Sequence, residues 1–229
     1  MESRCWPELD DDDAPLPAVR ESAVRGGDFL WRPGDAFSGP VIVHSGCVMV
    51  YRVSPAGEEQ VLQFALPGDL IGLEALASGQ HDLHARALGE VLCCRIPYWP
   101  TGSATDPPGL SRRLLLRASN ILARGHHRVR HDDPTGSVLD FLRDIGQRLG
   151  REEGDGDERS LHLRLPMSRL EIGRYLGFAE ETVCRAIRRL EEQGVIEARG
   201  RHVSLLEGPN EPPKAHDAQA DDGPGHHGR

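Results

Sequence analysis

The side chains with the clearest chemistry in this 229-residue sequence are an acid and a guanidinium four positions apart, Glu181 and Arg185. Positions four apart share one face of a helix. An Arg guanidinium can donate two parallel hydrogen bonds to guanine, and a Glu carboxylate can accept one from the amine of cytosine. The pair is therefore suited to reading base edges in DNA, although on an isolated amphipathic helix it would be an ordinary solvated ion pair.

The residues before this pair predict two short helices joined by a tight turn. Ser168 followed three residues later by Glu171 forms a capping box, and Gly177 can end the first helix in a left-handed conformation. A second helix is predicted from about Ala179 to a stop at Gly194. Its apolar residues recur at helical spacing. They are Val183, Ala186, Ile187 and Leu190.

A small hairpin is predicted after the second helix. Residues 195–196 and 202–206 are mostly apolar, and residues 198–201 supply the turn. Two helices joined by a tight turn and followed by a hairpin form a winged helix-turn-helix, whose second helix enters the major groove. In this setting, DNA reading is favoured over a solvated ion pair.

The segments LPMSRLEIGRYLG (165–177) and EETVCRAIRRLEEQGVI (180–196) resemble the helix-turn-helix of the Crp/Fnr transcription regulators. The resemblance is closest to their oxygen-sensing fumarate–nitrate-reduction branch, whose recognition motif is Glu-x-x-Ser-Arg. Glu181 and Arg185 match that motif, whereas Cys184 stands where the family has Ser. The resemblance implies a homodimer that binds an inverted repeat with half-sites like TTGAT or TTGAC, with RNA polymerase as a further partner.

Two departures from the family pattern affect this site. Cys184 weakens the expected contact to the outermost thymine, because a thiol is a poorer hydrogen-bond partner than a hydroxyl. Ala179 replaces the usual Thr N-cap, which should cost about 1 kcal/mol. We expect base contacts from Glu181, Cys184 and Arg185. We expect phosphate contacts from Ser168, Thr182, Arg188, Arg189, Arg199 and Arg201.

The overall charge does not contradict DNA binding. The formal net charge is −9, but much of the acid lies in residues 8–13, residues 152–158 and the C-terminal tail. Residues 160–206 carry eight Arg and six Glu, about +2. We find no membrane-spanning run, no signal-peptide pattern and no motif of an enzyme. The expectation is a cytoplasmic protein that is not an enzyme and has no membrane partner.

Residues 26–107 predict a β-roll sensor domain, because short apolar runs alternate with glycine turns. The segments RPGD, HSGCVMVYRV, GEEQVLQFALPGDLIGLEAL and CRIP resemble the cyclic-nucleotide-binding-like roll of the family. The predicted fold class is therefore α+β. It comprises an N-terminal β-roll, a long dimerisation helix and a C-terminal winged helix-turn-helix.

Cyclic AMP is not an expected ligand of this roll. Relatives that bind it carry a Gly-Glu and an Arg-Ser pair for ribose and phosphate. Here Gly68-Asp69 and Gly72-Leu-Glu74 are roughly in place, but Asp82-Leu83 occupies the Arg-Ser position. A cyclic phosphate beside Asp82 with no Arg to neutralise it is electrostatically unfavourable.

The cysteines stand at positions 5, 47, 93, 94 and 184, an odd number that argues against a disulfide framework. Oxygen sensors of the branch bind a [4Fe-4S] cluster through three cysteines near the N-terminus and a fourth in the sensor domain. Only Cys5 and Cys94 match, so neither this cluster nor another metal site is expected. Cys94 and Cys184 are the possible redox thiols, although Cys94 could simply pack in a strand. Cys184 sits early in a helix beside Arg185, a setting that lowers a thiol pKa.

Residues 108–131 predict the long dimerisation helix, which in the family pairs with its twin. Its six Arg and absence of acid predict repulsion and a marginal dimer. Its seam is Leu110, Leu114, Ala118, Ile121 and Leu122. The DNA-binding domain is predicted over 132–207, with a linker at 132–136 and a helix at 137–149. Residues 1–25 and 208–229 are predicted to be disordered.

The sequence leaves the signal open. A thiol-redox response, haem binding, a diffusible ligand and constitutive DNA binding are all compatible with it. An alternative from another class is a ligand-binding module that regulates a protein partner without DNA, which the presence of Glu181 and Arg185 at a helix start disfavours.

Overall fold

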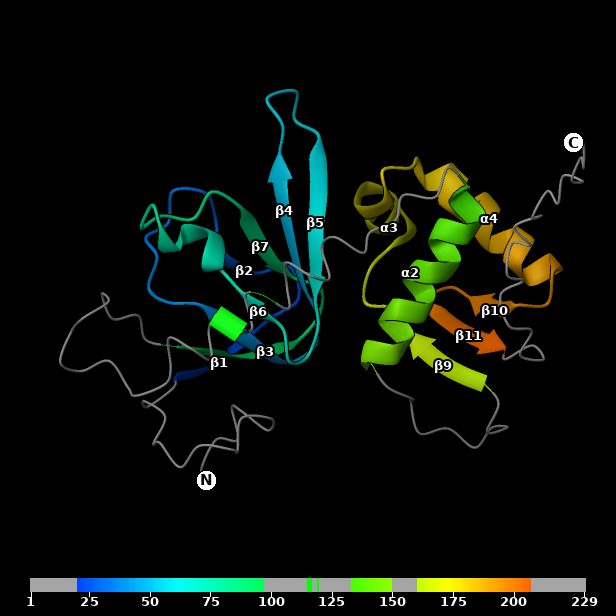
Figure 1. The fold of residues 1–229 in the computed structure, drawn as a ribbon, viewed down its shortest axis with the longest axis horizontal. Coiled ribbons are helices and arrows are strands. Elements are labelled where there is room, and N and C mark those ends of the chain that lie inside the picture. Colours follow the sequence, from blue (N-terminus) through cyan, green and yellow to red (C-terminus); the bar gives the residue numbers. More distant parts are fainter. Residues whose placement is uncertain (1–19, 97–114, 117–118, 120–132, 150–159, 207–229) are drawn as a thin grey trace, which may run out of the picture.

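The structure is a computed structural model that describes residues 20–96, 115–116, 119, 133–149 and 160–206. It consists of a β-roll and a helical part with a small sheet, shown side by side in Figure 1. This confirms the predicted α+β class. Most of the predicted dimerisation helix lies outside the described residues, including all five seam residues. No helix in the described ranges is long and apolar enough to cross a lipid bilayer.

The roll contains two four-stranded antiparallel sheets, with strand orders β1-β8-β3-β6 and β2-β7-β4-β5. Side chains from facing strands, such as Val43 of β3 and Val50 of β4, are buried together between the sheets. The elements are β1 Arg20–Val24, β2 Phe29–Trp31, β3 Val41–Ser45, β4 Val48–Val53, β5 Glu59–Ala65, β6 Leu70–Ile71, the 3-10 helix η1 Leu73–Leu76, β7 His84–Ala87 and β8 Val91–Arg95.

The roll begins earlier than predicted. Residues 20–24 were expected to belong to a disordered tail, but they form β1, which pairs with β8. The side chains of Glu21, Ser22 and Ala23 are exposed, so the strand is held mainly by backbone pairing at the edge of a sheet. An edge strand of this kind has no alternation of apolar and polar residues from which it could be predicted.

The helical part is a winged helix-turn-helix, as predicted. Its three-stranded sheet has the order β10-β11-β9, and the β10–β11 hairpin is the wing. Val138, Leu142, Ile172, Val183 and Leu190 form the centre of its core. The elements are α2 Pro134–Leu149, β9 Ser160–Arg164, α3 Arg169–Leu176, α4 Glu180–Glu192, β10 Ile196–Arg199 and β11 His202–Leu206.

Helix α2 begins three residues before its predicted start and includes part of the predicted linker. Asp133 caps it: the carboxylate accepts hydrogen bonds from the backbone N–H of Thr135 at 3.1 Å and of Gly136 at 2.9 Å. Pro134 follows as the first helical residue, where its fixed φ suits the helix and its missing N–H costs nothing. The Asp-Pro pair that suggested a linker is therefore a helix start.

The roll and the winged helix-turn-helix share one apolar core. Phe64 of β5 contacts Phe141 of α2 and Tyr175 of α3, with ring centroids 6.0 and 5.2 Å apart. Phe141 and Tyr175 also contact each other at 5.5 Å. In Figure 1, β5 forms the side of the roll that faces α3. The two parts are thus joined by packed aromatic side chains.

Candidate nucleic-acid interface

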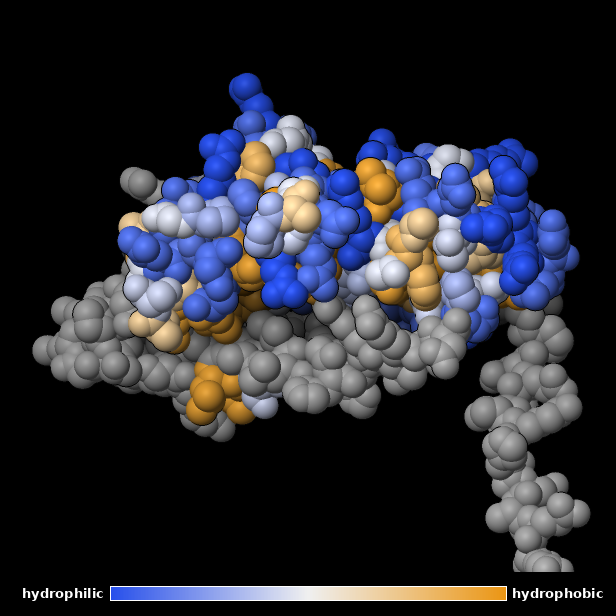
Figure 2. Space-filling model, turned by 90° about the horizontal axis from the view of Figure 1, so that it is seen from above, coloured by the Kyte–Doolittle hydropathy of each residue, from blue (hydrophilic) through white to orange (hydrophobic). Residues whose placement is uncertain are grey.

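Helix α4 buries one face and exposes the residues predicted to read DNA. Its apolar stripe, including Val183 and Leu190, is buried against the core. Glu181 and Arg185 lie on the exposed face, one turn apart, and Cys184 beside them is half-buried. Figure 2 shows that the end of the molecule occupied by α4 and the wing in Figure 1 is largely hydrophilic. The predicted base-reading residues therefore lie together on one accessible surface.

The start of α3 is fixed by the predicted capping box. The Ser168 Oγ accepts a hydrogen bond from the backbone N–H of Glu171 at 3.2 Å, and its hydroxyl donates to Glu171 Oε2 at 2.9 Å. The same Oε2 accepts from the backbone N–H of Ser168 at 2.7 Å. Ser168 was predicted as a phosphate contact, but here its hydroxyl hydrogen serves the cap.

The turn between α3 and α4 depends on two glycines. Gly177 ends α3 in the left-handed region with φ +81°, as predicted, and its N–H donates to the Gly173 carbonyl at 2.8 Å. Gly173 was not predicted to matter. A Cβ atom there would lie 2.5 Å from the Phe178 carbonyl oxygen, so only glycine lets the backbone after α3 come this close.

Helix α4 starts without a side-chain cap, as the Ala179 substitution predicted. The backbone carbonyl of Ala179 still accepts from the N–H of Thr182 at 3.0 Å and of Val183 at 3.2 Å. Glu180 and Glu181 lie in the first turn, where the partial positive charge of the helix N-terminus favours carboxylates. Glu181, which is predicted to read a base, therefore also stabilises the start of the helix.

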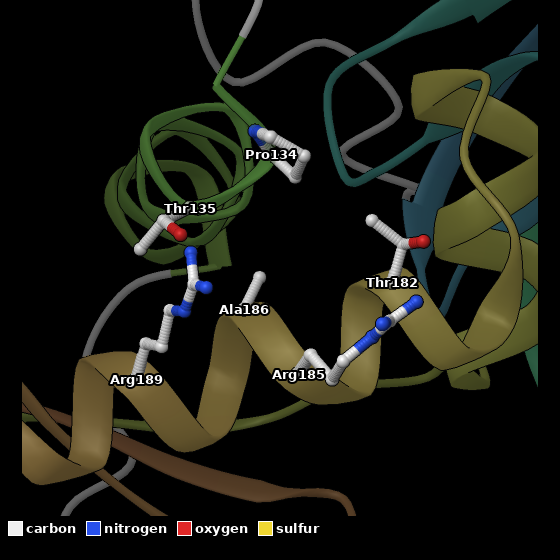
Figure 3. Close-up of a pocket in the computed structure, with 6 residues that line it drawn as sticks. All are labelled: Pro134, Thr135, Thr182, Arg185, Ala186 and Arg189. Carbon is white, nitrogen blue, oxygen red and sulfur yellow. The ribbon is translucent and has the colours of Figure 1, made fainter.

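A hollow between α4 and the start of α2 is lined by two cationic side chains (Figure 3). Arg189 extends towards Thr135, while Arg185 and Thr182 lie along the other wall. The hollow is lined by Pro134, Thr135, Thr182, Arg185, Ala186 and Arg189. An anion such as a phosphate suits a hollow of this composition.

The remaining predicted phosphate contacts are divided between free and engaged side chains. Arg188 and Arg199 are exposed on α4 and on the wing. Arg201 is also exposed, but its Nη1 donates to the Pro166 carbonyl at 3.1 Å. This bond links the wing to the segment before α3.

These features agree with comparisons to known proteins. Residues 21–99 match the cyclic nucleotide-binding domain, and residues 138–208 match the Crp-like helix-turn-helix domain. The transcriptional activator protein anr of Pseudomonas aeruginosa is 32% identical over 192 residues, which are 82% of this chain and 77% of that protein. Anr of Pseudomonas protegens is 33% identical over 208 residues, 84% of this chain and 81% of that protein. This chain belongs to the Crp/Fnr family.

A solved structure shares the fold of this chain. FixK2 from Bradyrhizobium japonicum aligns with a TM-score of 0.68 at 26% identity, over 84% of this chain and 94% of that one. The chain is therefore a DNA-binding transcription regulator of the Crp/Fnr type and not an enzyme, as predicted.

Arg169 is a residue of this Crp/Fnr interface that sequence reasoning missed. Its Nη2 donates to the carbonyl of Gly200, at the tip of the wing, at 3.0 Å. Burial lowers its pKa below the ordinary Arg value, and the neighbouring Cys184 and Glu191 oppose that shift. Arg169 therefore links α3 to the wing and lies near α4. Its position directly after the Ser168 cap was the only sequence signal for this role.

In the roll of this Crp/Fnr chain, aromatic side chains surround the turn at Gly72. The His81 ring stacks on Trp31 with centroids 4.3 Å apart, and its Nδ1 lies 3.0 Å from Glu74 Oε1. A Cβ at Gly72 would lie 3.3 Å from the Trp31 ring and 3.4 Å from the His81 ring. Aromatic rings thus pack against this turn, and the exposed Asp82 follows them.

The cysteines of the described ranges are in two different states. Cys47, Cys93 and Cys184 are free thiols, whereas Cys94 is fully buried and takes part in a disulfide. The disulfide differs from the expectation drawn from the odd cysteine count. Within the described residues, no three His, Cys, Asp or Glu side chains are placed to share a metal ion.

Proposed function

We propose that this regulator binds, as a homodimer, an inverted repeat whose half-sites resemble TTGAT or TTGAC. The observation that supports this is the exposed Glu181–Arg185 pair, one turn apart on α4 above a buried stripe. The two Pseudomonas relatives named above are transcriptional activator proteins. We infer that this chain also acts on transcription, in the cytoplasm, with RNA polymerase as its partner at promoters.

Selection from random double-stranded DNA tests this proposal. The purified full chain should enrich an inverted repeat of TTGA-containing half-sites. Centres of the half-sites about 10 base pairs apart would place the two recognition helices of a dimer in successive major grooves. Sedimentation of the complex should give two protein chains per DNA duplex. Enrichment of an unrelated sequence, or one chain per duplex, would refute the proposal.

A second candidate function is thiol-dependent control of the same DNA binding, through Cys184. Of the free thiols in the described ranges, Cys47 and Cys93 are buried, and burial raises the pKa of each. A raised pKa makes a thiol less reactive, because the thiolate is the nucleophile. Cys184 is more exposed and lies beside the Arg169 guanidinium on the DNA-reading surface.

Peroxide treatment distinguishes this candidate. Oxidation of Cys184 should weaken DNA binding, and a thiol reductant should restore it if the product is a sulfenic acid or a disulfide. The variant Cys184→Ser has the family residue at this position and should bind DNA at least as well without responding to peroxide. Unchanged affinity of the oxidised wild-type protein would rule out this control.

A further inference from the structure

The capping glutamate of the helix-turn-helix is also bound by the sensor roll. Glu171 uses Oε2 for the cap of α3, whereas its Oε1 accepts a hydrogen bond from Arg86 Nη2 of β7 at 3.2 Å. Arg86 and Glu171 are 85 positions apart in the chain. One carboxylate therefore connects a strand of the roll to the first turn of α3.

The two side chains are held in place by their surroundings. The Glu171 side chain is 13% exposed and that of Arg86 is 28% exposed, so solvent screens their attraction less than it would on an open surface. The Arg86 guanidinium lies over the Tyr51 ring, 5.6 Å from its centroid. This contact to the aromatic face helps to orient the guanidinium towards Glu171.

Two other ion pairs join the roll to the same helices without touching the cap. Asp69 of the roll pairs with Arg148 at the end of α2. Glu59 of β5 pairs with Arg174 in the last turn of α3. The Glu59–Arg174 pair also joins the roll to α3, but it does not involve the Ser168–Glu171 cap. It therefore provides a matched control for the Arg86–Glu171 pair.

We propose that Arg86 is a positioning residue for DNA recognition that acts through Glu171 on the cap of α3. Without the Arg86 charge, the Glu171 carboxylate is held less firmly at the cap, and the first turn of α3 becomes less ordered. Helix α3 packs against α4 through the close Gly173–Phe178 turn, so a loosened α3 presents Glu181 and Arg185 less uniformly. A movement of β7 in the roll would reach the recognition helix by this route. The inference rests on the proposed DNA-binding function.

Arg86→Met tests the proposal because it keeps most of the apolar stem and removes the charge. Affinity for the selected inverted repeat should fall about fivefold or more. In the DNA-free protein, the Ser168 and Glu171 amides should exchange with solvent faster. Arg86→Lys should retain most of both properties. The control Glu59→Gln should change neither, although it removes an ion pair between the same two parts.

The variant Glu171→Gln distinguishes an effect of Arg86 through Glu171 from a general loss of protein stability. A Gln can still serve as the third residue of a capping box, but it lacks the charge that attracts Arg86. Adding Arg86→Met to Glu171→Gln should therefore weaken DNA binding no further. Equal losses from Arg86→Met in both backgrounds, or equal effects of Arg86→Met and Glu59→Gln, would overturn the proposal. A wild-type protein without sequence preference would refute the proposed function, while the amide exchange of Ser168 would still show whether Arg86 holds the cap.

Discussion

At the scale of single residues, the DNA-reading surface combines one matched pair with one substitution. Glu181 and Arg185 occupy the exposed face of α4, and Cys184 stands between them where the family has Ser. These positions follow from the sequence because the buried stripe of α4 fixes which side chains face outward. Arg169 could not be placed in the same way, since its partner is a backbone carbonyl 31 residues away.

Arg185→Ala should relax recognition at the guanine of the half-site. Loss of a bidentate contact costs roughly 1–3 kcal/mol at the matching base and less where that base is already changed. Affinities for the selected repeat and for a repeat with the guanine replaced, measured by fluorescence anisotropy, check this. Arg188→Ala is the control, because we predict that Arg188 contacts a phosphate, and loss of such a contact should weaken binding to both DNAs alike. An equal loss for Arg185→Ala on both would contradict its role.

At the scale of elements, the helix-turn-helix is held by local backbone geometry. The caps of α3 are formed within a few residues of the helix, so Ser168, Glu171 and Gly177 could be identified from the sequence. The role of Gly173 could not, because the need for glycine arises from the approach of the Phe178 carbonyl in space. The edge strand β1 was missed for a related reason: its stability comes from β8, not from its own pattern.

Gly173→Ala should destabilise the protein even though Ala is the better helix former. The new methyl group would meet a backbone oxygen at 2.5 Å, and overpacking of this kind costs about 1–3 kcal/mol. Denaturant unfolding measures the change. In Gly146→Ala of α2, the nearest atom, at 2.6 Å, belongs to the flexible Leu161 side chain, so the loss should be smaller. Comparable stability of Gly173→Ala and wild type would contradict the close approach.

The start of α2 should weaken at low pH. Hydrogen bonds from the backbone N–H of Gly136 and Thr135 hold the pKa of Asp133 below its ordinary value of 3.8. A depressed folded-state pKa stabilises the folded protein above the ordinary Asp pKa. This stabilisation is lost as the pH falls through the folded-state pKa. Asp133→Asn keeps a good N-cap but cannot titrate. Below pH 4, thermal unfolding should therefore show a steeper loss of Tm for the wild type than for the variant; parallel curves would refute this.

At the scale of the whole molecule, the roll and the winged helix-turn-helix are not independent units. Phe64 and Phe141 belong to one buried cluster that spans both parts, and the half-buried Tyr175 ring packs against it. Each domain could be predicted from its own sequence periodicity. No sequence pattern indicates, however, that Phe64 contacts Phe141, 77 residues later in the chain. Contacts of this range depend on how the finished domains dock.

Phe64→Ala should uncouple the two parts as well as destabilise them. Removal of a buried Phe side chain costs about 3–5 kcal/mol, and here the cavity opens between the domains. We expect the wild type to unfold in one calorimetric transition and the variant in two. Val43→Ala removes buried volume inside the roll alone and should lower the Tm while keeping a single transition. One transition for Phe64→Ala would show that other contacts suffice to couple the parts.

The aromatic contact also limits how far this regulator can be treated as a set of interchangeable modules. If the roll were exchanged for that of a relative, Phe141 and Tyr175 would face a foreign surface, and the hybrid would need a matching ring in place of Phe64. Chimeras that graft a new sensor roll onto this winged helix-turn-helix should therefore be designed with the aromatic contact between the two parts as a third component.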